Sequence, residues 1–303
     1  MISTVFLGTP AASLPCLRVT SSSTDLHLVI TRPDKPRGRS GRARSSPVKE
    51  AATRMGLPVA QPSSRKELEE ILFEVAPIDV GVVVAFGMIL PPAVLNIPSR
   101  GFVNIHFSLL PRWRGATPVE QAILSGDEET GVTLMVMDES LDTGPIVATA
   151  TTSIEPTETA GELTGRLADL GAGLLSEHLT DYAEGRMAPV FQRTAGASYA
   201  NRITTDQANV SARWPSDKFL RAVRAYSPRP GARFEDGALK VWAAAPTDLP
   251  PIEAGQLVFD GRRLYLGTAD RPVELIEVQV AGGKRMSGAA WARGRQEDLG
   301  RLP

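Results

Sequence analysis

The sequence predicts an α/β protein in which an open, doubly wound, mostly parallel sheet is followed by a small antiparallel β-barrel. In the first part of the chain, apolar runs of strand length alternate with segments whose apolar residues recur at helical spacing. In the last part, short strand-like runs are separated by hairpin turn signals. The length of 303 residues is also sufficient for two domains.

Five apolar runs account for the predicted sheet. Continuous apolar character is expected of parallel strands that are covered on both faces. The runs are TVFLG (4–8), LHLVITR (26–32), IDVGVVVAFG (78–87), FVNIHF (102–107) and GVTLMVMD (131–138). Helices are predicted at 65–76, 117–126 and 157–185, where apolar residues recur every three or four positions.

The helical period is lost after this last helix, and we interpret 189–206 as a linker. It would join a first domain at 1–188 to a second at 207–303. The second domain begins with an amphipathic helix at 216–227. Strand-like runs follow at 239–245, 255–259, 263–268 and 273–280, with Asp236-Gly237 and Asp260-Gly261 as turn signals. A small antiparallel barrel is the simplest arrangement of these runs.

Composition excludes several classes of protein. A single cysteine, Cys16, cannot form an internal disulfide, and three scattered histidines provide no set of metal ligands. Cys16 follows the first strand on a predicted helix, where a buried structural thiol is expected. The opening MISTVFLGTP lacks the features of a signal peptide, and the longest apolar run contains Pro91 and Pro92 and is too short to span a bilayer. We therefore expect a soluble cytoplasmic protein without a metal.

Basic charge is concentrated in two parts of a chain whose formal net charge is only −1. Residues 207–303 carry 15 basic and 11 acidic side chains, whereas 1–206 carry 18 and 23. Within the first part, the segment 32–49 has seven basic residues and one acid. A polyanionic partner would be attracted to these two places, although a charged segment is more often only a solvated loop.

The strand FVNIHF brings a candidate pair to the end of the sheet. Residues two apart on a strand face the same side, so Asn104 and His106 project together while Val103, Ile105 and Phe107 face the other way. Ligands bind at the carboxyl ends of such strands. Histidine can exchange a proton near neutral pH and an asparagine amide can donate to a developing oxyanion, which suits acyl transfer. A purely structural pairing of the two side chains is an equally good interpretation of the spacing.

A third candidate follows the strand-like VTLMVM, in DESLDTGPI. Asp142 could orient His106 and favour its charged form, although an aspartate before Thr-Gly is commonly a turn residue. The sequence contains neither a G-x-G-x-x-G nor a Walker fingerprint, so a nucleotide cofactor has little support.

Several of these segments together resemble one family of enzymes over nearly the whole chain. The segments are FLGTP, PDKPRGR with SSPVK, AFGMILP, NIHFSLLPRWRGATP and LDTGPI. They are similar to the methionyl-tRNA formyltransferases, which use 10-formyltetrahydrofolate. One departure is Phe107, which stands where many members of that family have glycine, and it could reshape the folate site.

The resemblance implies a Rossmann-like first domain, an OB-like second domain and formylation of the α-amine of initiator methionyl-tRNA. It implies that Asn104, His106 and Asp142 are catalytic. It further implies that folate lies against Ser108, Leu109, Leu110 and Pro111, and that tRNA contacts Arg37, Arg39, Arg42 and Arg202. A monomer without membrane attachment is expected. Lys218, Arg221, Arg224, Lys284 and Arg285 are weaker candidates for tRNA contacts.

Two other functions share some of these features. A formyltransferase that acts on an amino sugar nucleotide would have the same three catalytic residues. The segment 32–49, with its seven basic residues, and the second domain argue against this function. A folate- or tRNA-binding module without catalysis would not need Asn104, His106 and Asp142 together.

Overall fold

The computed structural model describes residues 1–36, 43–237, 239–295 and 299–303. Its contacts divide the chain into two compact units. The first comprises 1–118, 129–153 and 164–200, and the second comprises 119–128, 154–163 and 201–303. Both units are built on a sheet of seven strands.

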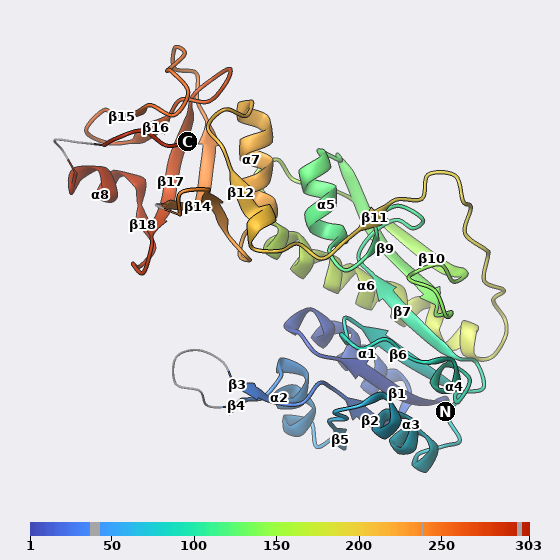
Figure 1. Cartoon of the computed structure of the whole chain (residues 1–303). Helices are drawn as coiled ribbons and strands as arrows, with labels where there is room; N and C mark the ends of the chain where they lie inside the picture. The colour runs from blue at the N-terminus through green and yellow to red at the C-terminus, as the bar shows by residue number, and fades with distance from the viewer. Residues whose placement is uncertain (37–42, 238, 296–298) are drawn as a thin grey trace. The chain divides into compact units, whose positions relative to one another are not determined.

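The sheet of the first unit has the order β10-β9-β7-β6-β1-β2-β5, as Figure 1 shows. Strands β7, β6, β1, β2 and β5 are parallel, and β9 is antiparallel to both of its neighbours. Their bounds are β1 Ser3–Gly8, β2 Asp25–Ile30, β5 Val59–Ala60, β6 Val80–Val84, β7 Phe102–His106, β9 Glu129–Val136 and β10 Ile146–Ser153. The predicted Rossmann-like, mostly parallel sheet is confirmed.

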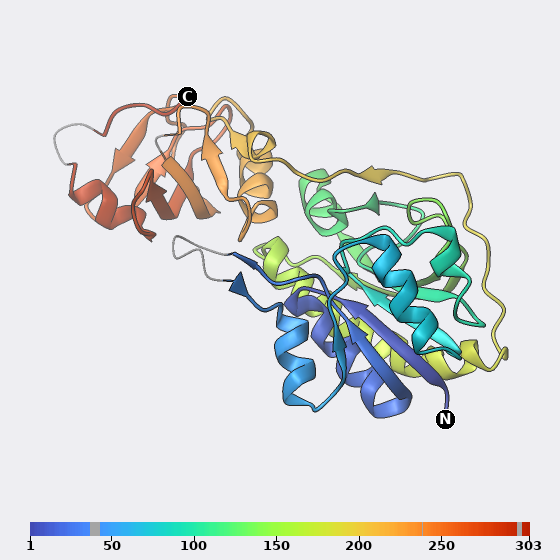
Figure 2. The ribbon, with the colours of Figure 1, turned by 60° about the horizontal axis from the view of Figure 1, so that its bottom comes forward.

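Helices lie on both faces of this sheet, as the two views in Figures 1 and 2 show. They are α1 Leu14–Ser23, α2 Pro47–Arg54, α3 Arg65–Glu74, α4 Pro92–Leu95 and α6 Ala160–Ala183. One face packs against α3 and α4 in a core that includes Val5, Leu7 and Phe102. On the other, α6 passes so close to β7 and β9 that a Cβ on Gly171 would lie 2.7 Å from Ile105 Cγ2.

The second unit contains a separate sheet with the order β12-β13-β14-β17-β16-β15, and β18 pairs with β17. The strands are β12 Asn209–Val210, β13 Ala232–Phe234, β14 Leu239–Pro246, β15 Leu257–Phe259, β16 Leu264–Leu266, β17 Val273–Val280 and β18 Met286–Ser287. The remaining α-helices among the described residues are α5 Pro118–Ser125, α7 Ser216–Ala225 and α8 Gly288–Arg293. Within the described residues, the strands pair along an open path and do not close into a barrel.

The two predicted hairpins are present, and several short elements were not predicted. Asp236-Gly237 joins β13 to β14, and Asp260-Gly261 joins β15 to β16, in antiparallel pairs. The additional pairs are β3 Lys35–Pro36 with β4 Ala43–Arg44, and β8 Arg114–Gly115 with β11 Tyr199–Ala200. Among the described residues, no helix is both long and apolar enough to cross a bilayer.

Cys16 lies on α1 and is completely buried, as the sequence predicts. Burial, with a smaller contribution from the charge of Asp169, raises the pKa of its thiol to about 12. The thiol therefore stays protonated and shielded throughout the physiological pH range.

We expect Cys16 in the native protein to resist alkylation by iodoacetamide at pH 8 and to react promptly in 6 M guanidinium chloride, because only unfolding restores an ordinary, accessible thiol. The measurement is the rate of mass increase under the two conditions. Equal rates would contradict the burial of this side chain.

Candidate active site

Asn104 and His106 occupy the carboxyl-terminal end of β7, in the interior of the first sheet. β7 lies between β6 and β9, with Asn104 aligned to Val83 on one side and to Met135 on the other. The alternate residues Val103 and Ile105 are buried, as predicted. Asn104 is half-buried, and no described residue bonds to its side-chain amide. Its donor is therefore available to a ligand.

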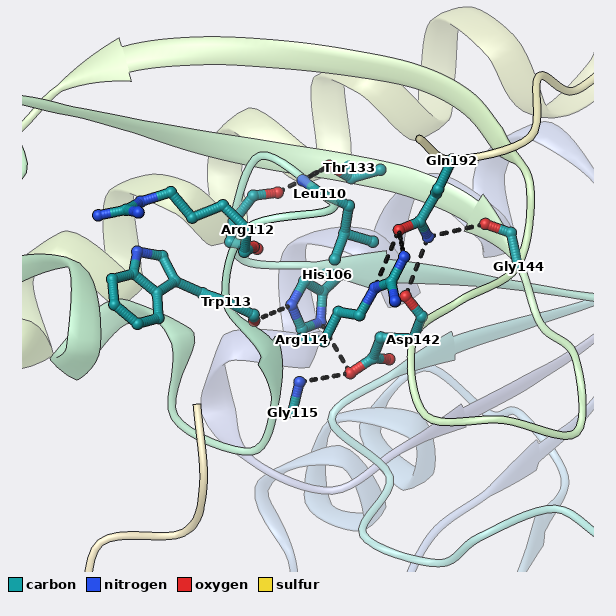
Figure 3. A network of polar contacts seen from close by, with 11 residues as sticks. His106, Leu110, Arg112, Trp113, Arg114, Gly115, Thr133, Asp142, Gly144 and Gln192 are labelled. Carbon is teal, nitrogen blue, oxygen red and sulfur yellow. Dashed lines mark hydrogen bonds and ion pairs between the residues drawn. The ribbon is translucent and has the colours of Figure 1, made fainter. Parts of the chain in front are cut away.

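The His106 ring is buried and held at one nitrogen. Nε2 lies 2.9 Å from the carbonyl oxygen of Trp113, whereas Nδ1 faces Asp142 Oδ2 at 3.7 Å (Figure 3). A carbonyl oxygen can only accept, so Nε2 carries the proton of the neutral ring and Nδ1 keeps its lone pair. The distance of 3.7 Å exceeds a hydrogen bond. A proton taken up by this ring therefore goes to Nδ1, beside a carboxylate.

The Asp142 carboxylate is held by a backbone amide of the loop that follows β7. Its Oδ2 accepts a hydrogen bond of 2.8 Å from the backbone amide of Gly115. Its own backbone is in the left-handed region, with φ of +53°. Aspartate tolerates this conformation better than most residues, but it remains less favourable than an ordinary turn. The structure thus brings His106 and Asp142 together, with Asn104 two residues before His106 on the same strand.

The loop after β7 is folded so that the Trp113 carbonyl reaches His106. Thr133 of β9 donates to the carbonyl of Ser108 at 2.7 Å and accepts from the amide of Leu110 at 3.1 Å. The Ser108 hydroxyl donates to the Arg112 carbonyl at 2.6 Å. Finally, Ser198 Oγ accepts the Trp113 amide at 2.9 Å. These bonds close the loop back over the strand end.

The predicted folate segment, 108–111, belongs to this same loop. Ser108 and Leu110 are buried, and Leu109 and Pro111 are half-buried. Because the Ser108 hydroxyl is engaged inside the loop, the more accessible Leu109 and Pro111 provide most of the surface that a ligand could contact. The assignment of this segment to folate stays a prediction.

Two functional candidates were missed in the sequence, Arg114 and Gln192. The buried guanidinium of Arg114 donates from Nε and Nη2 to Gln192 Oε1, at 3.1 and 2.7 Å. Gln192 Nε2 donates to the carbonyls of Asp142 and Gly144, at 2.9 and 2.8 Å. No sequence signal marks Gln192, because it lies in the segment interpreted as a linker.

The predicted tRNA contacts fall in different parts of the chain. Arg37, Arg39 and Arg42 lie outside the described residues. The chain on either side of them forms the β3–β4 pair, and Asp34 nearby bonds to Lys49 Nζ at 2.7 Å. The hydrogen bond from Lys49, followed by a second one from Gln61, lowers the pKa of Asp34. Arg202 is exposed, and no described residue bonds to its side chain.

The weaker candidates in the second unit differ in what they contact. Lys218 stacks over Trp214 at 4.1 Å and Arg285 over Trp242 at 3.6 Å, measured to the ring centroids. Internal pairs also engage three of the arginines, including Arg285, whose Nη1 lies 3.6 Å from Glu277 Oε2. Arg221 pairs with Asp217, and Arg224 donates to the carbonyl of Glu158. The described residues contain no cluster of His, Cys, Asp or Glu suited to a metal ion.

Comparison with known proteins identifies relatives over both units. The family model "Formyl transferase" matches 9–179, and "Formyl transferase, C-terminal domain" matches 202–296. The chain is 41% identical over 297 residues to the methionyl-tRNA formyltransferase of Streptomyces coelicolor, covering 96% of each chain. It is 42% identical over 304 residues to that of Mycobacterium ulcerans, covering 97% of each.

Solved structures with low sequence identity share the fold. An N-formyltransferase from Helicobacter canadensis, in complex with folinic acid and dTDP-3-aminofucose, has a TM-score of 0.69 at 19% identity, covering 91% of this chain and 99% of that one. HypX from Aquifex aeolicus, in complex with tetrahydrofolic acid, has a TM-score of 0.68 at 16% identity, covering 100% and 50%.

We expect Thr133→Val to lower both stability and turnover, because it removes the hydroxyl that holds Ser108 and Leu110 and leaves a buried amide without a partner. The loss in unfolding free energy should be about 1–3 kcal/mol. Urea unfolding measures the loss of stability, and the rate of formation of formylmethionyl-tRNA measures the loss of turnover. Thr151→Val, at an exposed position of β10, is the control, and equal behaviour of the two variants would contradict the role of Thr133.

Proposed function

This chain belongs to the methionyl-tRNA formyltransferase family, and on that premise we propose how its own side chains transfer a formyl group from 10-formyltetrahydrofolate to the α-amine of methionyl-tRNA. One observation carries the proposal. His106 has one nitrogen fixed by a carbonyl and the other facing a carboxylate, at the strand end where Asn104 offers an unused donor. His106 can thus act as the base, Asp142 as the carboxylate that orients it, and Asn104 as the donor to an oxyanion.

In this proposal the amine nitrogen forms a bond to the formyl carbon, and the bond from that carbon to N10 of the folate then breaks. The amine must lose one proton and N10 must gain one. Nδ1 of His106 accepts the first proton and returns it to N10, because Nε2 remains bonded to Trp113. Asp142 stabilises the imidazolium that exists between the two transfers. The products are formylmethionyl-tRNA and tetrahydrofolate, with no net change in protonation of the enzyme.

Asn104 has a separate task. Negative charge develops on the formyl oxygen as the amine adds, and a fixed amide donor stabilises it. The Asn104 side chain is suited to this because no described residue competes for its donor. Its place on β7, between two other strands, keeps it rigid.

Ser108, Leu109, Leu110 and Pro111 are proposed to line the folate site. The loop that they form is anchored to β9 by Thr133, so its exposed side is held at a fixed distance from His106. Leu109 and Pro111 would supply apolar contact to the flat ring system of the ligand.

Recognition of tRNA is assigned to the two basic parts of the chain. Arg37, Arg39 and Arg42 would contact the acceptor arm, and Arg202 with the positive second domain would hold the body of the tRNA. We propose the division into 1–188, 189–206 and 207–303, an OB-like arrangement of the second domain, a monomer and a cytoplasmic location. The assignment of tRNA binding to the second domain is supported by the stacking of Lys218 on Trp214 and of Arg285 on Trp242, because each ring holds a cation in place.

We expect His106→Ala and Asn104→Ala each to lower kcat by about 10²–10³-fold, because each removes a group that acts in the transition state. Formation of formylmethionyl-tRNA from 10-formyltetrahydrofolate is the assay. His27→Ala and Asn96→Ala are the matched controls and should retain activity within about twofold, as expected of surface changes. Near-normal turnover of either site variant would refute the mechanism, and formylation of an amino sugar nucleotide instead of methionyl-tRNA would refute the substrate.

Replacing Arg37, Arg39 and Arg42 together by alanine should raise KM for methionyl-tRNA and leave KM for the folate unchanged. The dependence of log KM on log salt should become shallower by about two to three, since each phosphate contact contributes about one to the slope. Arg18, Arg54 and Arg65, all exposed, provide a control triple variant that loses the same charge. An identical salt slope in both triple variants would contradict a specific role for Arg37, Arg39 and Arg42.

A further inference from the structure

We infer that Gln192 is a positioning residue for Asp142, and this rests on the catalytic role proposed for Asp142. Gln192 lies outside the segments that carry the resemblance, fifty residues after Asp142. Its side chain nevertheless connects the Asp142 loop to a buried arginine of the loop that follows β7 (Figure 3).

The orientation of the Gln192 amide is determined by its partners. Oε1 faces the Arg114 guanidinium, which can only donate, and Nε2 faces two carbonyl oxygens, which can only accept. A reversed amide would place its NH2 group against the guanidinium and its oxygen against two carbonyl oxygens. Gln192 therefore has one stable orientation, and all four of its contacts hold the same two loops.

The Asp142 loop has a shape that requires such support. Asp142 adopts a φ of +53°, and Gly144 lies so close to β9 that an added Cβ would be 1.9 Å from the Val136 carbonyl oxygen. Left-handed backbone at a residue other than glycine persists where its surroundings enforce it. The two bonds from Gln192 Nε2 span this turn. Beside them, Ile146 and Val190 exchange hydrogen bonds of 2.8 Å that dock the Gln192 segment on the loop.

Arg114 keeps Gln192 in place from the other side. Its guanidinium is buried, and the carbonyl oxygen of Gln192 is its side-chain partner among the residues that the structure describes. Loss of Gln192 would leave a buried cation without an acceptor, which is strongly unfavourable. The Gly115 amide, which holds the Asp142 carboxylate, directly follows Arg114 in the chain. Asp142 is thus held at its carboxylate by the Gly115 amide and at its carbonyl by Gln192, and Gln192 is itself held by Arg114, the residue before Gly115.

The decisive experiment measures kcat and both KM values for Gln192→Ala, Asp142→Asn and the double variant. We expect Gln192→Ala to lower kcat by about 10–100-fold, since a displacement of about 1 Å can cost 10²-fold. Both KM values should stay within about threefold. In the Asp142→Asn background, the same replacement should cost less than about threefold, because the carboxylate that it positions is already absent.

Gln192→Glu tests the bonds donated to the Asp142 loop separately from the bonds accepted from Arg114. It retains an acceptor for Arg114, so it should fold even if Gln192→Ala does not, but it cannot donate to the carbonyls of Asp142 and Gly144 unless protonated. We expect its kcat to fall at least as far as that of Gln192→Ala. Thr194→Ala, an exposed neighbour, is the control and should behave as the wild type.

Wild-type kcat in Gln192→Glu would overturn the inference, because the donors would then be unnecessary. Losses that multiply in the double variant would also overturn it, because Gln192 would then act independently of Asp142. The proposed function itself is tested separately by wild-type formylation and by Asp142→Asn alone. If Asp142→Asn is fully active, the mechanism fails, whereas failure confined to the Gln192 variants refutes only this inference.

Discussion

The hydrogen bond between His106 Nε2 and the Trp113 carbonyl is the constraint on which the site depends. It determines which nitrogen of the ring is free, and it turns that nitrogen toward Asp142. The loop that carries Trp113 is held in turn by Thr133 and Ser198, from β9 and from the segment before β11. A small movement of this loop would change the direction of the ring as well as its surroundings.

The segment 190–200 is the second requirement, because it joins the loops that carry Trp113 and Asp142. Val190 pairs with Ile146, Gln192 holds the turn at Asp142, and Ala200 pairs with Gly115. At Gly115, with φ of +120°, a Cβ would lie 2.6 Å from the Ala200 carbonyl, so only glycine permits this approach. A segment whose only regular element among the described residues is the two-residue strand β11 thus completes a site that begins on β7. The end of β7 determines where His106 lies, and the segment 190–200 determines where the loops that carry Trp113 and Asp142 lie.

The parts of the structure that follow from local rules were accessible from the sequence. Alternation along a strand places Asn104 and His106 on one side, apolar runs predict the parallel strands, and Asp260-Gly261 predicts a hairpin. Strand β10 was not predicted, because it is an edge strand in which small and polar residues alternate and its burial is low. Gln192 was not predicted because its partners are 48 to 78 residues away, and glutamine has no preferred sequence context for such a contact. The left-handed backbone of Asp142 likewise results from packing that no local pattern encodes.

The geometry of His106 and Asp142 also explains why this pair would contribute to rate more than to binding. In the neutral ring, a lone pair on Nδ1 faces the carboxylate at 3.7 Å, and no hydrogen bond joins them. In the proposed mechanism Nδ1 accepts the amine proton, and the same two atoms then become a donor and an acceptor of opposite charge, whose attraction in a buried site is much stronger. The contact therefore gains strength only as the reaction proceeds. An interaction that is weak in the ground state and strong beside the transition state lowers the barrier, because it stabilises the later state selectively. On the proposed mechanism, the position of Asp142, and hence the segment that holds it, therefore matters more than its mere presence.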